Sequence, residues 1–154
     1  MIQNQFVSFS IGRRSIAAAV FKGAKLEFWQ TRSFQSTAEG AGNAVTAFFN
    51  WIVSAFEIES AVLEELPQEL QTRNAFLSRL VEDHMREHGI PIFKASEEDL
   101  LGAYGEPPLR TRAELRRRAV AMFPQLTNPP AQKELLDAAV LGLYYQTERL
   151  LSDY

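Results

Sequence analysis

Three segments rich in strand-forming residues open the chain, and only short turns separate them. The segments are residues 6–11, 15–21 and 26–31, and the turns are Gly12-Arg13-Arg14 and Lys22-Gly23-Ala24-Lys25. Glycine and charged residues between alternating apolar residues are typical of hairpin turns. Consecutive strands joined so closely must pair antiparallel. The sequence therefore predicts a three-stranded meander at the start of the fold, and everything that follows has to pack on it.

Helices and strands alternate after the meander, as apolar spacing and capping signals indicate. We expect, in order, a helix opened by a capping box at residues 36–39 and ending near 56, a strand at 58–66, a helix at 68–88, a strand at 90–94, a short helix opened at 96–99, a helix from 111 to 123, and a last helix drawn from residues 128–143. A meander followed by this alternation predicts an α/β fold with one mixed five-stranded sheet, its last two strands parallel, and helices on both faces. This is the plan of the ribonuclease H-like fold.

Length and composition limit the classes of protein that fit. The 154 residues suit a single domain spanning 1–154. The chain has no cysteine, which excludes disulfides and thiolate chemistry and fits a cytoplasmic location. We expect no signal peptide and no membrane span, since no apolar run is long enough. The formal net charge is -3, so any contact with nucleic acid has to come from a local basic patch.

Two acids mark the beginning of the last helix. Glu134 and Asp137 are three residues apart, which places both carboxylates on one helical face. The residues after Asp137 are almost all apolar, so this face is expected to enter the protein interior. A buried carboxylate costs free energy unless a proton, a cation or hydrogen bonds compensate it. The pair is therefore either a favourable interaction with the helix dipole or part of a site.

The element order resembles that of the RuvC Holliday-junction resolvases, and the C-terminal third carries the closest local likeness. There an arginine-rich capped helix at residues 110–118 is followed by Asn128-Pro129 and by the acid-containing helix at 134–143. The resemblance covers the whole chain by element order but only about a third of it by local sequence.

The resemblance implies a site in which four acids hold two divalent cations, Mg²⁺ or Mn²⁺, around a phosphodiester. By position the acids correspond to Glu64, with Glu65 as the alternative, and to Glu134 and Asp137; the first-strand acid is replaced by Ser10. A neutral hydroxyl is a poor ligand for Mg²⁺, which depends on carboxylate charge. We therefore expect a degenerate site with weak metal binding and lost or weak phosphodiesterase activity in a protein that binds nucleic acid. The alternatives are an active metal-dependent endonuclease and a scaffold for a protein partner.

Arginines supply the basic patch that binding to DNA or structured RNA would require. Residues 110–118 contain five arginines and one acid, and two more arginines lie in the first turn. The candidates for phosphate contacts are Arg13, Arg14, Arg112, Arg116 and Arg117. The alternative interpretation is an ordinary solvated helix face.

Two further residue pairs have weaker functional interpretations. His84 and His88 have the spacing of a zinc-binding pair, but their charged neighbours favour an exposed helix end. Tyr144 and Tyr145 are expected in the core or in an interface, where they would support a homodimer.

Overall fold

The computed structural model describes residues 5–35, 37–65 and 73–152, and its elements follow the predicted order. The strands are β1 (Gln5–Ile11), β2 (Ser15–Lys22), β3 (Lys25–Ser33), β4 (Ile58–Glu64) and β5 (Ile92–Ala95), and the helices are α1 (Ala38–Ala55), α2 (Arg73–Glu87), α3 (Glu97–Ala103), α4 (Arg112–Met122) and α5 (Lys133–Ser152), with a 3₁₀ turn at Pro124–Leu126. None of these helices is both long and apolar enough to cross a membrane.

The strands form one sheet in the order β3-β2-β1-β4-β5. The meander β1-β2-β3 is antiparallel, and β4 and β5 run parallel to β1, as predicted. The fifth strand lies at an edge, where the missing N–H of Pro91 just before it is tolerated. The carbonyl of Pro91 still accepts a hydrogen bond of 3.0 Å from the backbone N–H of Ala61.

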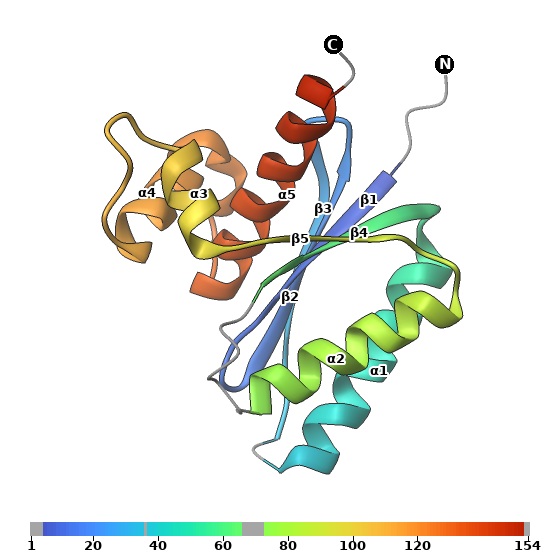
Figure 1. The fold of residues 1–154 in the computed structure, drawn as a ribbon. Helices are drawn as coiled ribbons and strands as arrows, with labels where there is room; N and C mark the ends of the chain where they lie inside the picture. Colours follow the sequence, from blue (N-terminus) through green and yellow to red (C-terminus); the bar gives the residue numbers. More distant parts are fainter. Residues whose placement is uncertain (1–4, 36, 66–72, 153–154) are drawn as a thin grey trace.

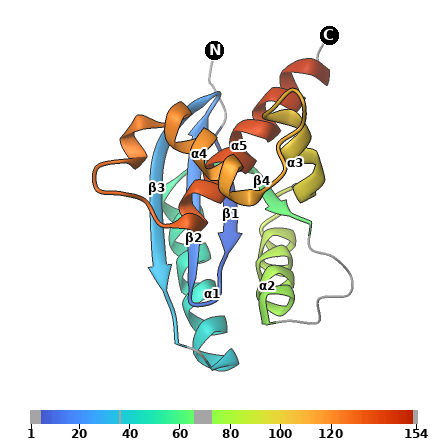
Figure 2. The same cartoon turned by 90° about the vertical axis from the view of Figure 1, so that its left-hand side faces the viewer.

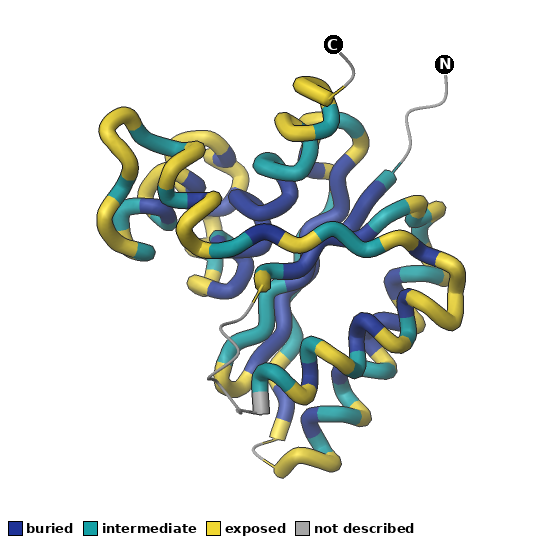
Figure 3. The backbone as a smooth tube through the Cα atoms, viewed as in Figure 1, coloured by how far each residue is buried: buried dark blue, intermediate teal, exposed yellow. Residues whose placement is uncertain are grey.

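Helices cover both faces of the sheet, which confirms the predicted architecture (Figure 1). On one face α1 and α2 bury the side of β1 that carries Val7 and Phe9. On the other face α3, α4 and α5 pack over Phe6 and its neighbour Phe21 (Figure 2). Because successive side chains of a strand point to opposite faces, the central strand β1 is buried on both sides, with Ser8 as a polar residue on the α5 side. Figure 3 shows this buried centre between the more exposed outer helices.

Small residues allow α5 to lie close to the sheet. Ala17 and Ala19 of β2 face α5, and Gly142 of α5 lies directly on the ring of Phe21. A Cβ atom at Gly142 would be 2.2 Å from Phe21 Cε2, so this position has no room for a side chain. The fully buried hydroxyl of Ser8 donates a 2.5 Å hydrogen bond to the carbonyl of Ala138 and ties β1 to α5 at the same level.

Two predicted helix starts were wrong. Thr37, not Ser36, caps α1: its hydroxyl accepts a 3.1 Å hydrogen bond from the N–H of Gly40. The last helix begins at Lys133 rather than in the stretch from 128, and it extends beyond residue 143. Pro129 and Pro130 explain the late start, because proline supplies no N–H and disfavours the helical conformation of the residue before it. Ser36 and residues 66–72, the first part of the predicted second helix, lie outside the described residues.

The other two predicted caps are confirmed. Ser96 and Asp99 form a reciprocal capping box at the start of α3. Thr111 caps α4 by accepting a 3.2 Å hydrogen bond from the N–H of Glu114. This second cap sets where α4 begins.

Candidate functional site

A cavity of about 170 Å³ lies where β1 and β4 end beside the first turns of α5. The two strands are parallel neighbours, and their register pairs Phe9 with Leu63, so Ser10 and Glu64 lie side by side. The residues lining the cavity are Phe9, Ser10, Ile11, Leu63, Glu64, Ser78, Arg112, Arg116 and Asp137. Three of the four predicted site positions, Ser10, Glu64 and Asp137, thus come together although they are far apart in the sequence.

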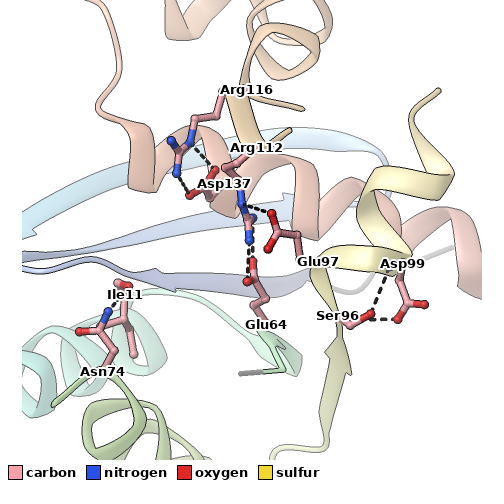
Figure 4. Close-up of polar contacts among 9 residues, drawn as sticks. All are labelled: Ile11, Glu64, Asn74, Ser96, Glu97, Asp99, Arg112, Arg116 and Asp137. Carbon is pink, nitrogen blue, oxygen red and sulfur yellow. Dashed lines mark hydrogen bonds and ion pairs between the residues drawn. The ribbon is translucent and has the colours of Figure 1, made fainter. Parts of the chain in front are cut away.

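Glu64 is held by Arg112 of α4 through two parallel hydrogen bonds (Figure 4). Arg112 Nη1 lies 2.8 Å from Glu64 Oε1, and Nη2 lies 2.7 Å from Oε2. Burial lowers the pKa of Arg112, but the hydrogen bonds and the charge of Glu64 outweigh it, and the net effect raises the pKa. A second acid, Glu97, lies 3.6 Å from Arg112 Nε. The guanidinium is therefore permanently charged and already occupied by carboxylates.

Asp137 is held in the same way by Arg116, one helical turn further along α4. Arg116 Nε lies 2.9 Å from Asp137 Oδ1, and Nη2 lies 2.9 Å from Oδ2. The hydrogen bonds to Asp137 raise the pKa of Arg116, against the effect of its burial. Asp137 is only 9% exposed, so the compensation that its burial requires comes from this arginine.

The buried face of α4 explains why these two arginines point inward. Leu115 and Ala119 are fully buried, and they share a helical face with Arg112 and Arg116 at spacings of three and four. The apolar side chains anchor the helix, and the two guanidinium groups beside them reach the cavity. Arg117, on the opposite side, is exposed.

The five predicted phosphate contacts therefore separate into two groups. The guanidinium groups of Arg112 and Arg116 are engaged with the acids of the cavity. Arg13, Arg14 and Arg117 are exposed, the first two in the turn between β1 and β2. The sequence contained a signal for this division, since Arg112 and Arg116 share the spacing of the apolar residues Leu115 and Ala119 and Arg117 does not.

Glu134 lies beside the cavity and does not line it. It is 7% exposed and shares a buried helical face with Asp137, as the spacing predicted. Its carboxylate lies against Gly12: a Cβ atom at Gly12 would be 2.1 Å from Glu134 Oε1. Within the described residues this carboxylate has no hydrogen bond and no ion pair, but its charge helps to raise the pKa of Arg116. Glu65, the alternative to Glu64, is exposed and does not line the cavity.

These residues do not fit a site for two divalent cations. Ser10 supplies a neutral hydroxyl, and both oxygens of Glu64 and of Asp137 already accept hydrogen bonds from guanidinium groups. Across residues 5–35, 37–65 and 73–152 no three histidine, cysteine, aspartate or glutamate residues are arranged to hold a metal ion. The positive charge that such acids would require from metal ions is present here on arginine.

The other pairs that the sequence singled out have contacts within the chain. His84 Nε2 lies 3.0 Å from the Thr46 hydroxyl, and the His84 ring stacks on Phe49, while His88 is exposed. The Tyr145 hydroxyl donates a 2.8 Å hydrogen bond to Ser60. The Tyr145 side chain is thus used within the fold, and the homodimer stays a prediction.

Comparison with solved structures identifies the fold. A Thermus thermophilus RuvC structure matches with a TM-score of 0.72 and 18% identity, over 94% of this chain and 96% of that one. The yeast mitochondrial Holliday junction resolvase matches with a TM-score of 0.67 and 9% identity, over 97% of this chain and 81% of that one. The fowlpox virus Holliday junction resolvase matches with a TM-score of 0.61 and 12% identity, over 93% of this chain and 99% of that one. No protein-family model matches the chain, and no curated protein matches it by sequence. The chain has the RuvC-like, ribonuclease H-like fold that its sequence predicted.

Proposed function

We propose that this protein is a RuvC-like domain that binds branched or otherwise structured DNA and does not cleave it. The observation that carries the proposal is the state of the cavity, where Arg112 and Arg116 neutralise the acids that a two-cation mechanism would use. Two of the matching structures are described as complexes with Holliday junction DNA, one of T. thermophilus RuvC and one of the fowlpox virus resolvase. The shared fold supports binding, and the altered cavity supports loss of cleavage.

The exposed arginines are the proposed phosphate contacts. Arg13 and Arg14 lie in the turn after β1, next to Gly12, which contacts Glu134 at the start of α5. Arg117 lies on α4, whose inner face reaches the same region through Arg116. Arg13 and Arg14 therefore lie near the sheet end that contains the cavity, and Arg117 lies on the outer face of the helix that reaches it. For a protein with net charge -3, such a local cluster is what nucleic-acid binding requires.

Fluorescence anisotropy with a labelled four-way DNA junction, in buffer containing EDTA, tests the binding. R13A/R14A is expected to weaken binding and to reduce the dependence of affinity on salt, by a slope of about 2 for two lost phosphate contacts. K22A/K25A is the matched control, because it removes the same charge from the turn between β2 and β3, at the opposite end of β2. Equal losses in the two variants would contradict the assigned surface.

Cleavage is tested on the same junction with Mg²⁺ and with Mn²⁺. We expect no cleavage product with either cation. Product that appears with Mg²⁺ and disappears in E64Q would instead support the alternative, an active nuclease using Glu64, Glu134 and Asp137 with Ser10 tolerated. Absence of binding to both the junction and duplex DNA at low salt would contradict the proposed function and favour the alternative of a scaffold for a protein partner.

A further inference from the structure

Two positively charged side chains, those of Arg112 and Arg116, line the cavity. The four side chains Glu64, Asp137, Arg112 and Arg116 contribute two negative and two positive charges, paired by four hydrogen bonds of 2.7–2.9 Å. The two pairs are also coupled, since the charge of Asp137 contributes to raising the pKa of Arg112 and the charge of Arg112 opposes the rise at Arg116. They behave as one electrostatic unit.

The geometry points to a specific role for this unit. We infer that Arg112 and Arg116 act as built-in replacements for divalent cations, which keep metal ions out of the cavity and hold α4 over it. A guanidinium fork matches a carboxylate in a bidentate manner and remains charged at any physiological pH. A divalent cation that entered would have to displace both guanidinium groups and approach two fixed positive charges.

The backbone of α4 supports the inference, because it fixes the arginines before any ligand arrives. Thr111 caps the helix at its first turn, and Leu115 and Ala119 are buried against the core between and beyond the two arginines. Arg112 and Arg116 side chains are 20% and 30% exposed, so most of each lies inside the protein. Such side chains are held in place, unlike the exposed Arg117 and Arg118 on the same helix.

Once both guanidinium groups are removed, Glu64 and Asp137, which both line the cavity, lose the hydrogen bonds that compensate their charges. Two carboxylates that line one cavity and have no partners attract a hard divalent cation. Removal of the two arginines should therefore uncover a cation site that the natural protein does not offer. This inference rests on the part of the proposed function that denies cleavage, and it does not depend on nucleic-acid binding.

The experiment compares Mn²⁺ binding to three proteins, by calorimetry and by electron paramagnetic resonance of free Mn²⁺. R112Q/R116Q keeps polar side chains of moderate length but loses both charges, and it is expected to bind Mn²⁺ saturably with a dissociation constant of roughly 10⁻⁴–10⁻³ M. The natural protein and R112K/R116K, which retains both charges, are expected to show no saturable binding in that range. Thermal unfolding supplies a second readout: Mn²⁺ should raise the Tm of R112Q/R116Q only.

Three results would overturn the inference. The first is that the natural protein binds Mn²⁺ as tightly as the R112Q/R116Q variant does. The second is that the R112Q/R116Q variant folds but binds no Mn²⁺. If R112Q/R116Q does not fold in EDTA, the inference expects Mn²⁺ to restore its folded circular dichroism spectrum, and failure to do so is the third. The junction-binding isotherm in EDTA is a separate measurement, so the proposed function and this inference can fail independently.

Discussion

Arg112 and Glu64 are 48 positions apart in the sequence and are joined by two parallel hydrogen bonds of 2.8 and 2.7 Å. This pair connects the first turn of α4 to the last residue of β4. Arg116 and Asp137 repeat the relationship between α4 and α5. The cavity of this RuvC-like fold is therefore lined by two ion pairs that also join three elements of the structure, and this arrangement can be tested by stability measurements.

Removing Arg116 should cost more stability than removing an arginine on the outer face of α4. R116A leaves Asp137 buried without its partner, and we expect a loss of about 2–3 kcal/mol, below the range for a fully buried pair because Arg116 is 30% exposed. The matched control R118A changes an exposed side chain and should stay within about 0.5 kcal/mol. Urea denaturation provides both values.

The double-mutant cycle of R116A and D137A isolates the pair itself. The two residues share both hydrogen bonds, so a coupling energy of about 1–3 kcal/mol is expected. Additive effects, with no coupling, would show that the observed contact does not contribute to stability.

Gly12 should tolerate no side chain while Glu134 is present. A Cβ atom at Gly12 would lie 2.1 Å from Glu134 Oε1 and 2.6 Å from its Cδ and Cγ. We expect G12A to lower the free energy of unfolding by about 1–3 kcal/mol through this overlap. The variant G12A/E134A removes all three opposing atoms and should recover most of that loss. A double variant that is no more stable than G12A would place the cause elsewhere in the turn.

Gly142 in α5 should show the opposite of the usual preference of helices for alanine. Alanine is favoured over glycine in a helix interior by up to about 1 kcal/mol. At Gly142 a Cβ atom would instead be 2.2 Å from Phe21 Cε2, so G142A should destabilise the protein by about 1–3 kcal/mol. Gly102 in α3 is the control, because a Cβ atom there meets nothing within 4 Å. G102A should be neutral or stabilising in the same thermal unfolding assay.

Tyr104 should make the protein sensitive to alkaline pH. Burial raises the pKa of its hydroxyl above the ordinary value of 10.0, and the hydroxyl donates a hydrogen bond to the carbonyl of Val140. The folded state therefore holds this proton more tightly than the unfolded state does. The resulting stability is fully present below pH 10.0 and is lost progressively as the pH rises above that value.

The variant Y104F tests this pH dependence. It should be less stable than the natural protein at about pH 8, by roughly 1 kcal/mol for the lost hydrogen bond. Its stability should then fall less steeply between about pH 10 and about pH 11. Burial also raises the pKa of Tyr144, so part of the slope should remain in Y104F and decrease further in Y104F/Y144F. Parallel slopes for the natural protein and Y104F in urea denaturation would contradict the assignment.

Local signals in the sequence were sufficient to predict most of the fold. Turn residues and alternation predicted the meander, helical periodicity predicted the helices, and the caps at Ser96 and Thr111 are where the pattern placed them. Each of these features depends on interactions between residues a few positions apart. The errors at Ser36 and at residue 128 concern helix ends, where neighbouring residues offer competing caps or lack an N–H.

The candidate site was only partly predictable. The sequence by itself determined that Glu134 and Asp137 share a helical face, that an acid ends β4, and that Ser10 occupies the corresponding position on β1. It did not determine which cation the acids meet. That choice depends on how α4 docks on α5 beside the end of β4, and the docking is decided by the burial of Leu115 and Ala119 against residues distant in the chain. Only the tertiary structure therefore turns Arg112 and Arg116 inward and leaves Arg117 in solvent, because side chains on one helix differ only in the face they occupy until the helix has packed.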